Sequence, residues 1–218
     1  MTTYTQPNNL ADLLQYELDK FQSREQVTVL SGESVVMGEV IGKITKTTPT
    51  TGTADVGDTG DGTCGSVVAG DSAQLGTYTL TCTAEAANAG TFEVLAPDGS
   101  TLPDATVGVA YANDQINFTI ADGAEDFDIG DIFTIDVAAG SAKIVPIEFA
   151  AVDGSQDAYG VIIAAVDASA ADVEGVAIVR DGQIVANYLT WPDGVTDAQK
   201  NAALAQLKAK GIVERTEV

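Results

Sequence analysis

The sequence predicts a mainly β protein with two short helices, in which a small antiparallel β-sandwich interrupts a second β-rich domain. Three observations support this class. Apolar and polar residues alternate along several short segments, which is typical of half-buried strands. Lys and Arg are absent between Lys46 and Lys143, which marks a compositional boundary inside the chain. Thr196 and Gln199 form a capping-box signature ahead of a helical pattern near the C-terminus.

The boundary divides the chain into a host domain at 1–49 and 142–218 and an insert at 50–141. Fifteen Asp and Glu residues lie between Lys46 and Lys143, and all ten basic residues lie outside that stretch. Thr, Pro and Gly are frequent at one edge of the insert, and Ala, Gly and Ser at the other. Such a break is typical of one module placed inside another.

The insert is expected to be all β. Four of its segments alternate with period two, and Gly-containing turn signals separate them. Four or five strands with Thr-rich exposed faces favour a small antiparallel sandwich. The expected strands lie at 77–83, 91–95, 115–120 and 132–137.

The host domain shows further strand patterns on both sides of the insert. Asp181 and Gly182 form a dipeptide that favours a tight hairpin turn after the last of these strands. The expected host strands lie at 26–30, 35–44, 143–149, 160–166 and 175–180.

Two helices are expected in the host domain. Thr196 caps the C-terminal helix, an apolar stripe follows, and Gly211 ends it. The stripe comprises Ala203, Leu204 and Leu207, with Lys208 and Lys210 in the last turn. The N-terminal helix would begin after Asn9 and carry Leu10, Leu13, Leu14, Leu18 and Phe21 at helical spacing. This stripe either packs on its own core or docks on a partner.

The composition excludes several classes of function. The chain of 218 residues carries 32 acidic and 10 basic residues, for a net charge of −22, so we expect neither nucleic acid nor a membrane surface as a partner. Histidine is absent, which removes His-dependent nucleophile activation and His-ligated metals. No spacing singles out a catalytic carboxylate pair, so we expect no enzyme and no cofactor.

The N-terminal residues, the longest apolar run and the cysteines bear on localisation. Residues 1–7 lack the basic start and apolar core of a signal peptide. The apolar run at 160–166 is far shorter than the about 20 residues needed to span a bilayer. We therefore expect a soluble protein. Cys64 and Cys82 either form one disulfide or remain buried thiols.

Two loops and one aromatic residue are weaker candidates for sites. The Asp-rich segments 55–62 and 126–131 resemble calcium loops, but their spacing misses the EF-hand positions. Asp-Gly pairs are ordinary turn formers, so we expect these loops to be turns exposed to water, and we expect no metal. Trp191 is expected to anchor a loop or the core rather than to form a ligand platform.

Two ordered blocks of the host sequence carry a family resemblance. The first block comprises 23–32 (SREQVTVLSG) and 38–45 (GEVIGKIT). The second comprises 158–168 (AYGVIIAAVDA), 176–181 (VAIVRD), 189–194 (LTWPDG) and 198–207 (AQKNAALAQL), followed by Gly211 and Ile212. In order and spacing, these blocks resemble the head decoration proteins of tailed phages, the family typified by decoration protein D of lambda-like phages.

The resemblance implies a β-clip-like domain, made in the host cytoplasm, that binds the outside of the expanded capsid as a homotrimer and stabilises the shell. It implies no catalytic residues. The N-terminal segment, residues 2–25, would contact the major capsid protein. The candidate capsid-binding residues are Leu10, Leu13, Leu14, Leu18, Phe21 and Arg24. Arg24 would pair with an acid on the shell or in its own domain.

The resemblance does not assign a role to the insert, whose acidic surface we expect to point outward. The rival interpretation is a surface adhesion or carbohydrate-binding protein that uses the insert as its binding module. Aromatic stacking platforms would then be needed on the surface of the insert. Its aromatic residues are Tyr78, Phe92, Tyr111, Phe118, Phe127 and Phe133.

Overall fold

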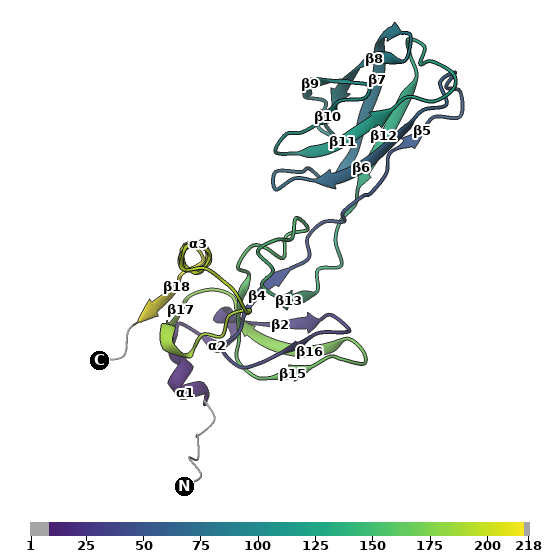
Figure 1. The fold of residues 1–218 in the computed structure, drawn as a ribbon. Coiled ribbons are helices and arrows are strands. Elements are labelled where there is room, and N and C mark those ends of the chain that lie inside the picture. Colours follow the sequence, from purple (N-terminus) through teal and green to yellow (C-terminus); the bar gives the residue numbers. More distant parts are fainter. Residues whose placement is uncertain (1–8, 216–218) are drawn as a thin grey trace. The chain divides into compact units, whose positions relative to one another are not determined.

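The computed structural model describes residues 9–215, which belong to two compact units (Figure 1). The host unit comprises Met1–Thr45 and Ser141–Val218, and the insert unit comprises Lys46–Gly140. These limits lie a few residues from the boundaries expected at 50 and 141. The mainly β class is confirmed, although the described chain contains three α-helices rather than two.

A closed five-stranded barrel forms the centre of the host unit, with strand order β13-β2-β16-β14-β4. Its interior is aliphatic, and Val29, Ile41, Ile144 and Ile162 are fully buried. The barrel strands are β2 (Arg24–Val29), β4 (Val40–Lys43), β13 (Ile144–Pro146), β14 (Gly160–Ile162) and β16 (Val173–Ile178). A two-stranded sheet accompanies the barrel, formed by β3 (Ser34–Val35) and β15 (Val166–Asp167). Whether this barrel is of the β-clip type stays a prediction.

A three-stranded sheet with order β1-β17-β18 and the C-terminal helix build the second host core. Leu13, Val40, Ile184 and Leu207 are buried together there. The strands are β1 (Leu14–Glu17), β17 (Gly182–Val185) and β18 (Ile212–Arg215), and the helices are α1 (Leu10–Leu13), α2 (Lys20–Ser23), α3 (Asp197–Ala209) and the 3-10 helix η1 (Ala186–Tyr188).

The C-terminal helix is confirmed in detail. In α3 the Thr196 side chain accepts from the backbone N–H of Gln199, and the Gln199 side chain accepts from that of Thr196. Ala203 and Leu207 are buried on the inner face. Gly211 follows with φ of +80°, a left-handed conformation that glycine adopts without a steric cost.

The predicted single N-terminal helix is wrong. Asn9 caps a helix as expected, through a capping box with Asp12, but α1 ends at Leu13. The next four residues form β1, which pairs antiparallel with β17. Asp19 then caps the separate one-turn helix α2. Pairing with a distant strand has overridden a pattern that locally favours one helix, because helical propensity is a weak preference.

Two host strand predictions and the predicted hairpin also need correction. The segment 35–44 is interrupted between β3 and β4 by a turn at Gly38, whose φ is +89°. The segment 160–166 divides into β14 and the start of β15. The expected hairpin at Asp181 is wrong, because β16 pairs with β2 and β14 whereas β17 pairs with β1 and β18.

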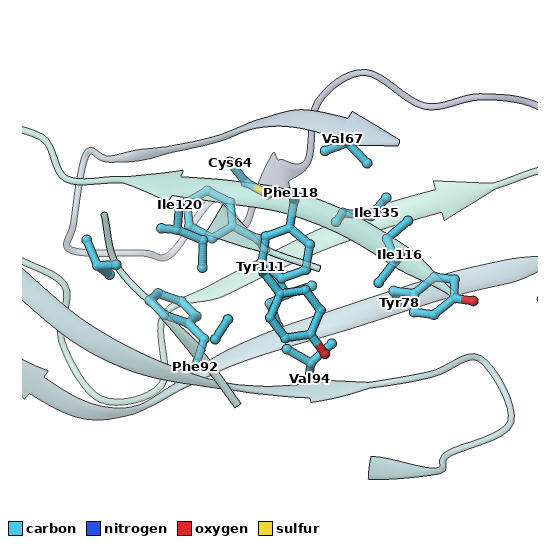
Figure 2. Packing of buried hydrophobic residues seen from close by; sticks show 14 of the residues in the cluster. Cys64, Val67, Tyr78, Phe92, Val94, Tyr111, Ile116, Phe118, Ile120 and Ile135 are labelled. Atoms are coloured by element: carbon cyan, nitrogen blue, oxygen red, sulfur yellow. The ribbon is translucent and has the colours of Figure 1, made fainter. Parts of the chain in front are cut away.

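The insert unit contains two antiparallel sheets around one core (Figure 2). One sheet has the order β5-β12-β7-β8-β9 and the other β10-β11-β6. The rings of Phe92, Phe127 and Phe133 pack against one another, with centroids 5.2–5.8 Å apart. The strands are β5 (Thr53–Ala54), β6 (Thr63–Ala69), β7 (Gly76–Ala86), β8 (Ala89–Leu95), β9 (Thr101–Thr106), β10 (Ala110–Tyr111), β11 (Ile116–Ala121) and β12 (Ile132–Val137).

The four expected insert strands are present as β7, β8, β11 and β12, but the estimate of four or five strands is too low. Strand β6 lacks a clean alternation because it is irregular at Ser66, whose φ is 52°, and its register against β11 shifts there. Strand β9 contains Pro103, which weakens a strand pattern and is tolerated at a sheet edge.

Candidate functional site

The structure separates the five apolar candidates of the N-terminal segment into two groups. Leu13 is 1% exposed in the host core, and Leu10 and Leu14 are partly buried against the same core. These three side chains stabilise the host unit and are not available as free anchors. Leu18 and Phe21, by contrast, are 57% and 85% exposed.

Tyr16 joins Leu18 and Phe21 as an exposed apolar side chain, with an exposed fraction of 52%. The predicted helix did not include Tyr16 in its apolar stripe. Tyr16 lies in the strand β1, and the strand determines which side chains of this segment face outward. Phe21 carries a neighbouring charge, since Lys20 Nζ lies 5.0 Å from the centre of its ring. We call Tyr16, Leu18 and Phe21 the exposed apolar patch.

The backbone of this segment is tied to the host unit on both sides of Leu18. Leu14 and Glu17 lie in β1, opposite Ile184 and Gly182 of β17. The N–H of Leu18 and the Oγ of Ser23 both donate to the carbonyl of Asp181, at 3.1 and 3.0 Å. The exposed apolar patch therefore extends from an ordered segment, and little further chain ordering would be needed for it to bind a partner.

Arg24 is paired within its own unit. Its Nε and Nη2 donate to the two carboxylate oxygens of Glu17, at 2.8 and 2.7 Å. The hydrogen bond to Glu17 raises the pKa of Arg24 above its ordinary value, although partial burial opposes the shift. This bidentate pair fastens β1 to the start of β2, so we assign Arg24 to the support of the segment.

The Asp-rich insert loops use their carboxylates to bind their own backbone. Asp131, which is 5% exposed, accepts from the N–H groups of Thr59, Gly60 and Asp128 at 2.9–3.0 Å. Burial alone would raise its pKa, but these three donors lower it below the ordinary value. Asp61 likewise accepts from two backbone N–H groups of the 122–126 turn. Within residues 9–215, no cluster of three potential metal ligands is found.

The remaining candidates belong to the two cores. Cys64 and Cys82 are free and buried, and burial raises the pKa of the Cys64 thiol to about 11. Trp191 is partly buried against the second host core. All six aromatic residues of the insert are less than 9% exposed, so the described insert presents no ring on which a sugar could stack. No helix in residues 9–215 is long and apolar enough to cross a bilayer.

Comparison with solved structures gives only distant likenesses. Two crystal structures of Xanthomonas campestris FlgL, in space groups H3 and C2, align with TM-scores of 0.31 and 0.32 at 17% and 20% sequence identity. The alignments cover 51% and 49% of this chain but only 34% and 33% of FlgL. The chain thus spans about a third of those structures.

Comparison with families gives a clear result, although no curated protein sequence matches. The family described as bacteriophage lambda head decoration protein D matches residues 3–212, which is nearly the whole chain and includes the insert. Members of this family are structural components of the phage capsid rather than enzymes. The chain belongs to the bacteriophage lambda head decoration protein D family.

Proposed function

We propose that this protein binds the outside of the expanded phage capsid as a homotrimer, contacts the major capsid protein and stabilises the shell. It would be made in the cytoplasm of the infected cell before joining the virion. Membership of the head decoration family supports a role on the capsid. The observation that carries the assignment to particular residues is the exposed apolar patch, held on an ordered segment of the host unit.

The size of this patch favours binding by several linked copies. Burying Leu18 and Phe21 contributes about 1.5–3 kcal/mol each, so these two side chains supply at most roughly 3–6 kcal/mol per copy. The loss of translational and rotational freedom on association offsets much of that gain. A trimer that places three patches on the shell at once would bind far more tightly than a single copy.

The test uses expanded capsids that lack decoration and the full-length chain. We expect Leu18→Ala/Phe21→Ala to weaken the affinity for the capsid by about tenfold or more, since truncating a hot-spot side chain costs about 2 kcal/mol or more, and about 1.4 kcal/mol is tenfold. The affinity is read from capsid occupancy below saturation. Ile129→Ala, at a position 65% exposed on the insert, is the matched control and should bind like the unchanged chain. Unchanged occupancy with both sets of variants would remove the patch from the interface.

A further inference from the structure

Three basic side chains gather around Tyr159 on the host unit. Lys43 Nζ lies 4.6 Å and Lys210 Nζ 4.9 Å from the centre of the Tyr159 ring, within the range of cation–π attraction. The Tyr159 hydroxyl donates to Glu25 at 2.6 Å, and Arg180 binds the other oxygen of that carboxylate at 2.9 Å. We call Lys43, Tyr159, Arg180 and Lys210 the basic patch.

Neither lysine of the basic patch forms an ion pair within residues 9–215, in a chain with 32 acids and only 10 bases. Lys210 Nζ donates to the carbonyls of Ala158 and Tyr159 at 2.8 and 3.1 Å. Partial burial lowers the pKa of Lys210; the nearby Asp157 raises it, and the charge of Lys43 lowers it further. Two ammonium groups on one ring repel each other, so a carboxylate placed beside both would relieve that repulsion.

A cavity of about 510 Å³ in the same host unit has the opposite character. Its apolar lining includes Ile44, Val145 and Ile147, and its lining contains no Lys or Arg. We call it the acidic groove, after the four acidic residues that line it: Glu33, Glu148, Asp153 and Asp193. Glu148 and Asp193 are exposed, and within the described chain neither takes part in an ion pair.

The basic patch and the acidic groove are formed by different residues of the host unit. Lys43, the last residue of β4, belongs to the patch, and the next residue, Ile44, lines the groove. The N–H of Ile44 donates to the carbonyl of Lys143 at 3.0 Å. Among the described residues, no ion pair joins a lysine of the patch to an acid of the groove. Both surfaces therefore keep charges that a second copy can pair.

We propose that the basic patch of one copy binds the acidic groove of the next copy. This inference rests on the proposed assembly of several copies and names the surfaces that join them. Opposite charges favour the contact, and the apolar lining of the groove suits the ring of Tyr159 and the carbon chain of Lys43. Because the two surfaces differ, the contact is head-to-tail, and such contacts close into rings when the rotation between copies allows it.

Zero-length carbodiimide cross-linking tests the contact directly. Isotopically light and heavy full-length chains are mixed, bound to expanded capsids, treated and digested, so that mass spectrometry separates cross-links between copies from those within one copy. We expect light–heavy cross-links from Lys43 or Lys210 to Glu148 or Asp193. Lys208, which is exposed on α3 and outside the patch, is the internal control and should not give them.

Charge reversal gives the second, independent test. Lys43→Glu/Lys210→Glu places acids against acids, and we expect it to reduce contacts between bound copies, seen as adjacent copies in images of decorated capsids, by about tenfold or more, since like charges across an interface cost several kcal/mol. Adding Glu148→Lys/Asp193→Lys to the same chain restores opposite charges and should restore the contact. Lys200→Glu/Lys208→Glu makes the same change in net charge at other sites and should leave it intact.

The outcomes separate this inference from the proposed function. If the unchanged chain failed to bind capsids, the proposed function would be wrong. If adjacent copies bound but their patch lysines cross-linked only to the shell protein, the head-to-tail inference would be wrong. The same would follow if the charge-reversed chain kept its contacts between copies. Neither result would contradict the proposed decoration of the capsid.

Discussion

The host unit and the insert unit differ in how far their aromatic side chains are exposed to solvent. The insert buries all six of its Tyr and Phe residues, whereas the host leaves Tyr16 and Phe21 more than half exposed. The insert also satisfies its buried Asp131 with its own backbone N–H groups. The host, by contrast, leaves Lys43 and Lys210 without an ion pair in the described chain. The difference supports the proposal that the binding surfaces lie on the host unit rather than on the insert.

The largest expected effect on stability concerns Leu13, near the start of the N-terminal segment. Leu13 is 1% exposed in the host core, so Leu13→Ala should lower the free energy of unfolding of the host unit by about 2–5 kcal/mol. Trp191, the single Trp of the chain, lies in the host unit, so its fluorescence in urea reports this transition. A loss below 1 kcal/mol would mean that the segment is a loosely attached arm after all.

The next effect concerns the insert alone. Asp131→Ala removes the acceptor of three backbone N–H groups, and we expect a loss of about 3 kcal/mol from the stability of the insert. Hydrogen exchange at Thr59 and Gly60 should accelerate, while the Trp191 transition of the host stays where it was. Asp136→Ala, at an exposed position of β12, is the control and should change neither.

The same carboxylate predicts how the insert responds to acid. The pKa of Asp131 in the folded insert lies below its ordinary value of 3.8, so folding favours the ionised form. The stabilisation is complete above the ordinary pKa and is lost as the pH falls through the lower folded value. The difference in stability between the unchanged insert and Asp131→Ala should thus shrink below about pH 4. A difference independent of pH would show that the charge of Asp131 is not what holds the loops.

The smallest effect on stability is expected at the exposed apolar patch. Phe21 is 85% exposed, so Phe21→Ala should change the unfolding free energy of the host by less than about 0.5 kcal/mol while weakening capsid binding. Denaturation in urea and capsid occupancy, measured on the same preparation, give both values. If binding fell only in proportion to a loss of folded protein, Phe21 would be a core residue rather than a contact.

Local patterns in the sequence predicted the elements whose structure depends on near neighbours. The capping box of Thr196 and the alternating strands β7, β8, β11 and β12 all appear where their residues indicated. The site was predictable only in part. Leu18 and Phe21 were named from their spacing, but Tyr16 was not, because its exposure follows from the pairing of β1 with β17, more than 160 residues away along the chain. The basic patch was equally hidden, since β4, the 158–159 segment and the residue that follows α3 come together only in the folded host unit.

The central claim is that the host unit decorates the capsid and that the insert does not take part. The two host segments that flank the insert lie side by side, because the N–H of Ala142 donates to the carbonyl of Ile44 at 2.9 Å. A short Gly-Ser linker can therefore join Thr45 to Ser141. The deciding measurement is the occupancy of expanded capsids by this shortened chain, imaged beside the full chain. We predict equal occupancy, with density missing only where the insert stood. Loss of occupancy by a shortened chain that still folds would contradict the claim and place the insert in contact with the shell.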